Sequence, residues 1–274
     1  MIDVHCHLLP GIDDGAGDMN EALAMARAAY ENGIRFSIVT PHIHPGRYEN
    51  SVQTISSALE KFKIALSKAG IPLRLGMAAE VRLSPEILPM IERDQIPFLG
   101  VLDGYRIMLL EFPHSHIPPG ADRLVEKLLA MKVRPLIAHP ERNKDVIRKY
   151  SKIEPFIEMG CFLQLTASAV AGRFGKMSHK RSLQLLGSDA FMMLATDAHN
   201  LKGRYPELRE GYEAAVELVG LEDARKLVVD NPMSVVRSQL VPDGGSVETA
   251  LLKMRAANSP ALRTEIASVT RRNR

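Results

Sequence analysis

Short apolar runs alternate with amphipathic stretches seven times along this chain, and this alternation constrains the fold more than any other feature. Such alternation is typical of α/β proteins with parallel strands. The runs are apolar almost throughout, which indicates strands that are buried on both faces. The expected strands are residues 2–7, 35–40, 73–81, 105–112, 134–139, 161–166 and 191–196. The expected helices are residues 19–32, 51–69, 84–94, 121–131, 143–159, 176–188 and 206–219.

Residue types that bind metals lie at or just after the ends of six of the seven runs. The first run carries His5 and His7, which share one face of a strand because side chains alternate along it. The same placement recurs at Asp14, His42, Glu80, Glu111, His139, Asp197 and His199. In a barrel every strand delivers its C-terminal residues to one face, where active sites form. The pattern therefore favours a barrel over an open doubly wound sheet, which would begin with a glycine-rich phosphate turn.

These nine candidate ligands are more than a single tetrahedral metal ion needs. Five are imidazoles and four are carboxylates, and a carboxylate can bridge two ions because it carries two oxygens. The set suffices for two or three metals, an arrangement that suits the hydrolysis of phosphate esters. A thiolate zinc site is excluded because Cys6 and Cys161 form no Cys-x-x-Cys pair. Mixed nitrogen and oxygen ligation fits zinc, manganese or iron.

Two arginines closely follow candidate ligands. Arg142 comes three residues after His139, and Arg204 follows Asp197 and His199 in a short loop. A guanidinium matches phosphate oxygens with two parallel hydrogen bonds, so either side chain is suited to hold a phosphoryl group. A surface ion pair is the better interpretation for an isolated arginine, but the position just after a ligand favours a catalytic role for both.

The remaining polar residues are assigned by their surroundings. Glu80 and Glu111 each end an apolar run, where an unpaired carboxylate would be costly to bury, so a ligand role is favoured. Asp14 is chosen as the ligand of its loop, and Asp13 as a structural residue. A role for His44 in the site is left open. Loop or surface roles are expected for three further histidines, His114, His116 and His179.

The composition of the chain indicates its expected compartment and which classes of partner are not expected. No apolar stretch approaches the ~20 residues that cross a bilayer, and no secretory signal pattern is seen, so we expect a cytoplasmic protein that is not embedded in a membrane. The net charge of +3 arises beyond residue 240, where six basic and three acidic residues lie. Residues 1–240 are thus formally neutral, and no nucleic-acid partner is expected. We divide the chain into a barrel domain, residues 1–240, and a basic extension, residues 241–274, that is partly helical or disordered.

Several short motifs surround the candidate ligands: His5-Cys6-His7, Thr40-Pro41-His42, Ala79-Glu80-Val81, Leu109-Leu110-Glu111, Ala138-His139-Pro140-Glu141-Arg142 and Thr196-Asp197-Ala198-His199. They resemble the motifs of the PHP (polymerase and histidinol phosphatase) metallohydrolase superfamily. Two longer strings are Leu9-Pro10-Gly11-Ile12-Asp13-Asp14-Gly15, and Gln164-Leu165-Thr166 with Gly172-Arg173-Phe174-Gly175. These resemble more specifically the bacterial manganese-dependent tyrosine-protein phosphatases of capsule and exopolysaccharide clusters, the CpsB/YwqE type. The resemblance covers roughly residues 1–235.

The resemblance implies a distorted (β/α)7 PHP barrel with a trinuclear centre at the C-terminal ends of the strands. The implied ligand sets are His5, His7, Glu80 and Asp197 for one metal, Glu80, Glu111 and His139 for a second, and Asp14, His42 and His199 for a third. Arg142 and Arg204 match arginines implicated in phosphate binding and catalysis. The implied metal is manganese, with iron or zinc as alternatives, and relatives form homo-oligomers. The implied substrate is the phosphotyrosine tail of a bacterial tyrosine autokinase that controls polysaccharide export.

We therefore predict a metal-dependent phosphoesterase that hydrolyses protein phosphotyrosine. Neither cysteine lies in the Cys-x5-Arg pattern of cysteine-dependent tyrosine phosphatases, so no covalent phosphocysteine is expected. Three alternatives stay open: a PHP-type small-molecule phosphatase such as a histidinol-phosphate phosphatase, an amidohydrolase-type deacylase, and a non-catalytic PHP interaction module. The presence of all nine ligands argues against the interaction module.

Overall fold

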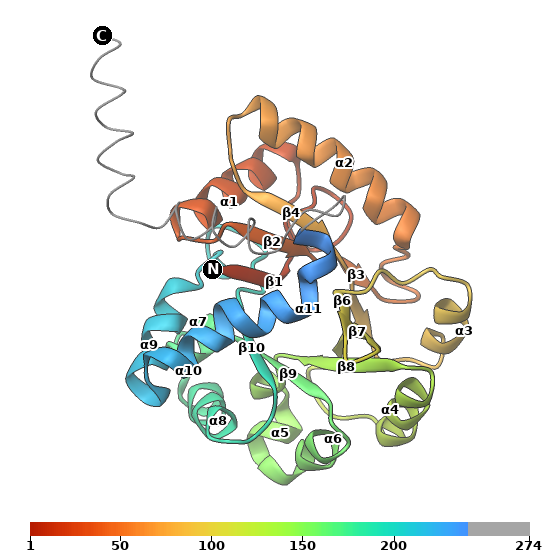
Figure 1. Ribbon diagram of the computed structural model, residues 1–274. Coiled ribbons are helices and arrows are strands. Elements are labelled where there is room, and N and C mark those ends of the chain that lie inside the picture. Colours follow the sequence, from red (N-terminus) through yellow and green to blue (C-terminus); the bar gives the residue numbers. More distant parts are fainter. Residues whose placement is uncertain (241–274) are drawn as a thin grey trace. The chain divides into compact units, whose positions relative to one another are not determined.

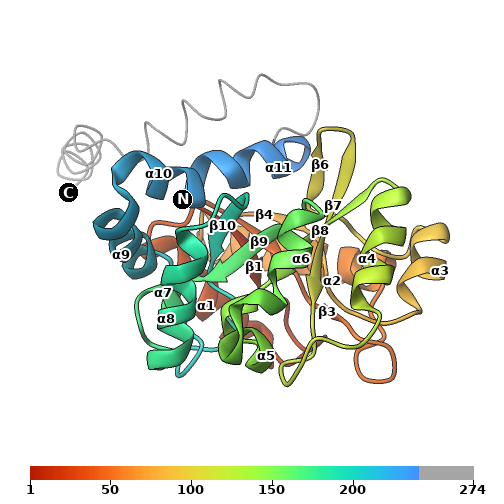
Figure 2. The same ribbon diagram turned by 90° about the horizontal axis from the view of Figure 1, so that it is seen from below.

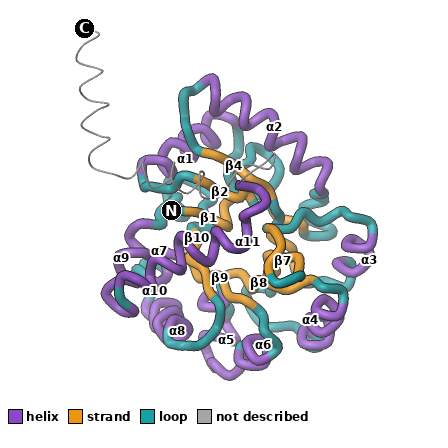
Figure 3. The backbone as a smooth tube through the Cα atoms, in the orientation of Figure 1, coloured by secondary structure: helices purple, strands orange, loops and turns teal. Residues whose placement is uncertain are grey.

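The computed structural model describes residues 1–240 of the chain. Residues Met1–Val236 form one compact unit, in which the strands lie inside a ring of helices (Figure 1, Figure 3). The predicted α/β class with parallel strands is confirmed. The predicted extension, residues 241–274, lies outside the described residues, so the domain division stays a prediction. No helix in the described part has both the length and the apolar character of a membrane span.

Each of the seven expected runs contains a strand, and one run, residues 73–81, is divided into two strands. They are β1 (Ile2–Cys6), β2 (Phe36–Val39), β3 (His42–Ile43), β4 (Arg74–Met77), β5 (Glu80–Arg82), β6 (Gly100–Leu102), β7 (Tyr105–Glu111), β8 (Val133–Ala138), β9 (Phe162–Thr166) and β10 (Met192–Ala195). The short strand β3 is absent from the expected set, and so is the short strand β6. Its turn to β7, Asp103-Gly104, has positive φ at both residues, 51° and 75°, which is the signature of a two-residue hairpin.

The strands form two sheets. One has the order β1-β2-β4, and the other has the order β10-β9-β8-β7-β5-β3 with β6 paired to β7. The β6–β7 pair is antiparallel, whereas the pairs that build the barrel wall are parallel. Because β4 and β5 are consecutive parts of one extended segment, the chain itself connects the two sheets on one side.

On the other side the two sheets meet along a seam between β1 and β10. Cys6 and Ala198 form a single parallel bridge there, and the N–H of His7 donates to the carbonyl oxygen of Ala198 at 2.9 Å. The buried carboxylate of Asp3 accepts from the backbone N–H (3.0 Å) and from the hydroxyl (2.6 Å) of Thr196. These bonds hold the first strand beside the last one.

Helices connect the strands and cover them on the outside. They are α1 (Met19–Glu31), α2 (Val52–Lys68), α3 (Ile87–Glu92), α4 (Ala121–Ala130), α5 (Lys144–Arg148), α6 (Glu154–Glu158), α7 (Ala167–Val170), α8 (Lys176–Leu186), α9 (Arg209–Val219), α10 (Leu221–Arg225) and α11 (Asn231–Leu240), with the helical turns η1 (Pro140–Arg142), η2 (Tyr150–Lys152) and η3 (Lys226–Asp230). The prediction of one helix over residues 143–159 is wrong. Helix α5 ends before Lys149, whose backbone is extended (φ −142°, ψ 109°). A new helix, α6, then begins with Pro155 in its first turn, where a proline is tolerated.

The strand ends define two faces of this unit. In Figure 2 the β6–β7 hairpin and α10 lie at one end of the strands, and α5, which follows β8, lies at the other. Side chains alternate along β1, so Asp3, His5 and the following His7 form one row and Ile2, Val4 and Cys6 form the opposite row. All six are buried. The polar row of β1 therefore runs toward the C-terminal end of the strands.

Candidate metal centre

The first group of ligand atoms forms where β1 ends. His5 and His7 are fully buried, and their Nε2 atoms lie 3.2 Å apart. Glu80 at the start of β5 places Oε2 3.2 Å from His5 Nε2 and 3.3 Å from His7 Nε2. Asp197, which follows β10, places Oδ1 3.2 Å and 3.5 Å from the same two nitrogens. One atom from each residue thus lies within 4.8 Å of the others, which is the convergence that a metal site requires.

A contact to the Nδ1 atom orients each imidazole of this group. His5 Nδ1 lies 2.7 Å from Oε1 of Gln164 on β9, and His7 Nδ1 lies 2.7 Å from Oδ2 of Asp13. Amide and carboxylate oxygens only accept, so each Nδ1 donates and each Nε2 keeps its lone pair for a metal. The expected strand at residues 161–166, which carries no candidate ligand, therefore serves the centre through Gln164.

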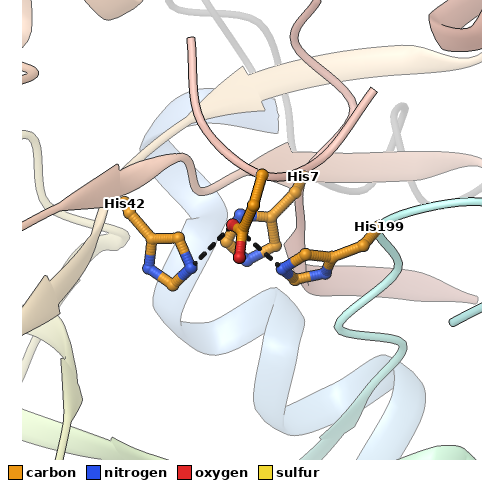
Figure 4. A group of neighbouring side chains, drawn as sticks. His7, His42 and His199 are labelled. Atoms are coloured by element: carbon orange, nitrogen blue, oxygen red, sulfur yellow. Dashed lines mark ion pairs between the residues drawn. The ribbon is translucent and has the colours of Figure 1, made fainter. Parts of the chain in front are cut away.

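A second group joins the loop after β1 to β3 and to the segment after β10. Asp14 Oδ1 lies 3.1 Å from His42 Nε2 and 3.5 Å from His199 Nε2. Figure 4 marks these ion pairs with dashed lines and shows His7, His42 and His199 pointing toward one another. His7 completes the group. Asp14 keeps 39% of its side chain exposed, so solvent reaches the centre on this side.

The loop that carries Asp14 is packed directly over His7. A Cβ on Gly15 would lie 2.2 Å from the carbonyl oxygen of His7, so no larger residue fits without a shift of the loop. Asp13 accepts from the backbone N–H of Gly15 at 2.9 Å and of His42 at 3.1 Å. Together with its bond to His7, Asp13 fixes the loop and two candidate ligands to one another.

The third group consists of His42, Glu80 and Glu111. Strands β3 and β5 pair with His42 opposite Glu80. His42 Nδ1 lies 3.1 Å from Glu80 Oε2 and 3.9 Å from Glu111 Oε2. His139, which follows β8, places Nε2 2.9 Å from Glu80 Oε1. The second ligand set implied by the resemblance joins His139 to both carboxylates, whereas here His42 lies within reach of both and His139 of Glu80.

Two candidate ligands have an unusual backbone conformation. His139 has φ +34° and Asp197 has φ +51°, in the left-handed region that residues other than glycine rarely adopt. Such conformations persist where the surroundings enforce them, and they cluster at functional sites. His139 comes directly after β8 and Asp197 comes two residues after β10, so the strained backbone sets the direction of each side chain at its strand end.

The donor atoms fit metal ions. His42 Nδ1, Asp197 Oδ1 and His199 Nε2 are buried and make no hydrogen bond. The ion-pair distances above bring carboxylates near these nitrogens, but not in hydrogen-bond geometry. Buried polar atoms are nearly always hydrogen-bonded, so unpaired lone pairs that converge on one space suit the binding of a cation. Imidazole nitrogen and carboxylate oxygen are ligands of first-row transition metals.

Electrostatics also suit a cation. Burial and the charge of Arg142 lower the pKa of His139 to about 4, and burial and the charge of His7 lower the pKa of His199 to about 4. Both imidazoles are therefore neutral near pH 7, which is the form that binds a metal. Burial and the neighbouring Glu80 raise the pKa of Glu111 to about 9, because two close carboxylates repel each other, and a bound cation offsets this repulsion.

Arg142 and Arg204 reach the centre through Asp197. Arg142 Nη1 and Arg204 Nη2 both donate to Asp197 Oδ2, while Oδ1 of the same carboxylate faces the histidines of the first group. The guanidinium of Arg142 also lies over the ring of Phe174, 4.8 Å from its centroid. The Nε of Arg204 is buried without a hydrogen bond, so it is a donor available to an anion such as phosphate.

The other histidines lie outside the three groups that the described residues form. His44, whose role the sequence leaves open, pairs with Tyr48 through two backbone hydrogen bonds of 3.0 Å and 2.8 Å. Three further histidines also lie outside these groups: His114, His116 and His179. All nine predicted ligands contact at least one other member of the cluster, and the assignment of each to a metal ion stays a prediction.

Sequence reasoning misses several residues that support the centre, among them Arg82, whose guanidinium lies 2.9 Å from the Glu111 carboxylate. Gln164 orients His5, Tyr48 stacks on His42 with ring centroids 5.5 Å apart, and Phe174 supports an arginine. An amide inside an otherwise apolar run is a signal for Gln164, because a buried amide needs a partner. Tyr48 and Phe174 lie in loops whose composition gives no such signal.

Comparisons with known proteins identify the family of this chain. The sequence model of the family described as capsular polysaccharide synthesis, CpsB/CapC, matches residues 1–237. Tyrosine-protein phosphatase YwqE of Bacillus subtilis (strain 168) is 35% identical over 241 residues, which cover 88% of this chain and 93% of YwqE. Tyrosine-protein phosphatase CpsB of Streptococcus pneumoniae is 27% identical over 246 residues, which cover 88% of this chain and 100% of CpsB.

The fold is also similar to a solved structure. That structure comes from work on YwqE from Bacillus subtilis and CpsB from Streptococcus pneumoniae, described there as unique metal-dependent tyrosine phosphatases. It superposes with a TM-score of 0.81 at 35% sequence identity and covers 88% of this chain and 96% of the solved chain. Because the family model spans nearly all of the described residues and a relative exceeds 30% identity, the chain belongs to the CpsB/CapC family of capsular polysaccharide synthesis.

Proposed function

We propose that this chain is a metal-dependent protein-tyrosine phosphatase. The observation that carries the proposal is the meeting of three overlapping ligand groups with two arginines at one carboxylate, Asp197. The relatives named tyrosine-protein phosphatases support the choice of phosphotyrosine. In the reaction water adds to phosphorus, the bond between phosphorus and the phenolic oxygen breaks, and tyrosine and inorganic phosphate are released.

The metal ions would polarise the phosphoryl group and activate the attacking water. The proposed ligands are His5, His7, Asp14, His42, Glu80, Glu111, His139, Asp197 and His199. Glu80 belongs to two of the three groups, and its two oxygens can serve two ions, which supports two or three ions per chain. We propose manganese as the ion, with iron or zinc as alternatives, because the donors are nitrogen and oxygen.

Arg142 and Arg204 hold the phosphoryl group in this proposal. Asp197 anchors one N–H of each guanidinium, and the N–H groups that remain are donors for phosphoryl oxygens. Such donors stabilise the negative charge that spreads over these oxygens in the transition state. A tyrosine phenolate has a pKa of ~10, so it leaves with less help from a proton donor than an alkoxide would.

The biological setting follows from the family. We propose that the substrate is the phosphotyrosine tail of a bacterial tyrosine autokinase, and that the protein acts on it in the cytoplasm as a homo-oligomer. The match to a capsular polysaccharide synthesis family supports a role in the control of polysaccharide production.

The test compares a phosphotyrosine peptide with histidinol phosphate, each with and without Mn²⁺. We expect phosphate release from the peptide that depends on the metal. A clear preference for histidinol phosphate would reassign the chain to small-molecule phosphatases. If metal binds and neither ester is hydrolysed, an interaction module becomes the better interpretation.

A further inference from the structure

A groove lies between the loop after β5 and the first turns of α4. It has a volume of about 280 Å³ and is mostly apolar, with Leu83, Leu88 and Leu124 among its lining residues. Two cations, Arg123 and Lys127, also line it. Pockets that enclose a whole small molecule have volumes of roughly 300–1,000 Å³, so this groove suits one or two side chains of a peptide.

The groove begins next to the metal centre. Leu83 donates its backbone N–H to the carbonyl oxygen of Glu111, a candidate ligand, at 2.8 Å. Arg82, one residue earlier, binds the Glu111 carboxylate at 2.9 Å and the carbonyl oxygen of Phe112 at 3.3 Å. Metal centre and groove therefore share the C-terminal ends of β5 and β7, the face of the barrel on which a substrate must bind.

The far wall of the groove is formed by the loop between β7 and α4, and this loop is held in place. Asn143 donates to the carbonyl oxygen of Pro113 at 2.8 Å, and Asp145 accepts from the backbone N–H of Ile117 at 3.1 Å. Pro118 and Pro119, which line the groove, have little backbone freedom. A groove with a fixed shape loses little entropy when a peptide binds.

The charge at the groove is positive and unpaired. Arg123 and Lys127 are four residues apart on α4 and so share one face of the helix. Both are exposed, and neither takes part in an ion pair with another described residue. Asp122 and Glu126 of the same helix do not line the groove.

Positive charge continues from the groove to the metal centre. Partial burial and then the charges of Arg142, Lys144 and Arg82 lower the pKa of His114, which lies in the loop between β7 and α4. These three cations therefore lie near enough to this loop to act on the His114 imidazole. An acidic peptide lying from the groove to the metal centre would therefore meet favourable potential along its path.

We propose that this groove binds the residues that flank phosphotyrosine in the protein substrate, with an acidic side chain at Arg123 and Lys127 and an apolar side chain on the three leucines. A phosphotyrosine in a protein is part of a continuous chain, so its neighbours must lie across the face that surrounds the metal centre. The groove is adjacent, preformed and complementary to an acidic and apolar segment. This inference rests on the proposed phosphatase function.

The experiment compares three substrates with the Mn²⁺-loaded protein. They are a phosphotyrosine peptide with flanking glutamate and leucine residues, the same peptide with the glutamates replaced by alanine, and p-nitrophenyl phosphate, which is too small to reach the groove. The variant is Arg123→Glu/Lys127→Glu. The matched control is Arg27→Glu/Lys68→Glu, which reverses two exposed charges on α1 and α2 and changes the net charge equally.

We expect the KM of the acidic peptide to rise about tenfold in the groove variant, a change of about 1.4 kcal/mol. The kcat of this variant for the acidic peptide should equal that of the wild type. Its kinetics with the alanine peptide and with p-nitrophenyl phosphate should also be those of the wild type. The control variant should behave as the wild type with all three substrates. An equal rise in KM for both peptides, or no rise for either, would overturn the groove proposal and leave the proposed phosphatase function unaffected. If the wild type hydrolyses none of the three substrates, the phosphatase function fails, and the groove proposal fails with it.

Discussion

At the scale of single residues, Asp197 connects the two parts of the site. One of its oxygens faces His5 and His7, and the other accepts from Arg142 and Arg204. The backbone is strained at this residue, with φ +51°, so its direction is set by the surrounding structure. Metal ligation and arginine placement therefore depend on the same carboxylate.

Replacement of Arg142 by alanine should lower kcat by about 10²- to 10³-fold, the usual effect of removing one preorganised donor from a transition state. Metal content should stay unchanged, because Arg204 still holds the second oxygen of Asp197. Steady-state kinetics and elemental analysis of the same sample measure both quantities. Arg148→Ala on α5, whose side chain is 74% exposed, is the control and should behave as the wild type. Loss of metal from Arg142→Ala would show that the arginine is structural.

Replacement of Asp13 by alanine should weaken metal binding by about 10- to 100-fold, the usual effect of removing a residue that orients a ligand. Asp13 holds His7 and the backbone of His42, so its loss frees both. Asp13→Asn keeps an accepting oxygen, so its affinity for the metal should lie between that of Asp13→Ala and that of the wild type. Titration of the metal-free proteins with Mn²⁺ gives the affinities.

Asp18→Ala is the control for Asp13. Asp18 caps α1 by accepting from the N–H of Glu21 at 2.9 Å, so this change should lower stability by about 1 kcal/mol and leave Mn²⁺ affinity unaltered. An Asp13→Ala protein with unaltered affinity would mean that His7 is oriented by its strand alone.

The sequence predicts that the nine candidate side chains meet, because the strand ends in a parallel barrel share one face. It does not predict which ligands share an ion. His42 lies opposite Glu80 because the two-residue strand β3 pairs with β5, and the sequence around Pro41 gives no sign that a strand restarts there. The roles of Gln164 and Phe174 likewise depend on contacts between segments that are distant in sequence.

At the scale of elements, the helices after β9 and β10 support one side of the site. Strand β9 leads into α7 and then into a loop that carries Phe174 to Arg142. Arg173 of this loop binds Glu210 of α9 with distances of 2.7 Å and 3.1 Å. Helix α9 packs so closely on α7 that a Cβ on Gly211 would lie 2.5 Å from the carbonyl oxygen of Ala167. The position of Phe174 thus depends on helix packing.

Replacement of Gly211 by alanine should destabilise the protein by about 1–3 kcal/mol, the usual effect of overpacking. For a domain of this size the melting temperature should fall by about 2–4 °C per kcal/mol. Thermal unfolding of the metal-loaded protein measures the change. Gly187→Ala, where the nearest atom to the new Cβ would be 3.6 Å away, should leave the melting temperature unchanged. A higher melting temperature for Gly211→Ala would mean that α7 and α9 move apart easily and accept the new methyl group.

The predicted elements differ from the observed ones where local chemistry interrupts a pattern. The expected helix at residues 143–159 is broken at the extended residue Lys149, and the run at residues 73–81 changes partners between β4 and β5. The hairpin at Asp103-Gly104 has a recognisable turn signature, so β6 is a strand that closer attention to turns would predict. The change of partners follows from the meeting of two sheets and has no local signal.

At the scale of the whole molecule, the centre gathers four carboxylates, from Asp14, Glu80, Glu111 and Asp197, around one space. Without cations these groups repel each other or bind protons, as the raised pKa of Glu111 shows. Metal ions that bind the folded state and not the unfolded chain therefore stabilise the entire barrel.

Chelation should abolish activity and lower the melting temperature, and Mn²⁺ should restore both. One site at a metal concentration of 100 Kd contributes about 2.7 kcal/mol, which corresponds to about 5–10 °C. Scanning calorimetry with and without chelator measures the shift.

Thiol alkylation is the matched control for chelation. Cys6 and Cys161 are buried, and burial raises the pKa of both thiols, that of Cys161 to about 12. Iodoacetamide should therefore leave activity intact and modify the cysteines only after denaturation, as mass spectrometry would show. Inhibition by alkylation with resistance to chelation would refute the metal mechanism.

The seam between β1 and β10 sets the moment at which this enzyme becomes active. Asp3 and Thr196 meet there across 193 positions of sequence, and the first ligand group needs His5 and Asp197 together. Contacts of such long range form late in folding. A chain that is still being synthesised, or that has not yet closed its barrel, therefore holds its ligands in separate pieces. The first ligand group is therefore complete only after β10 has been synthesised and has docked beside β1.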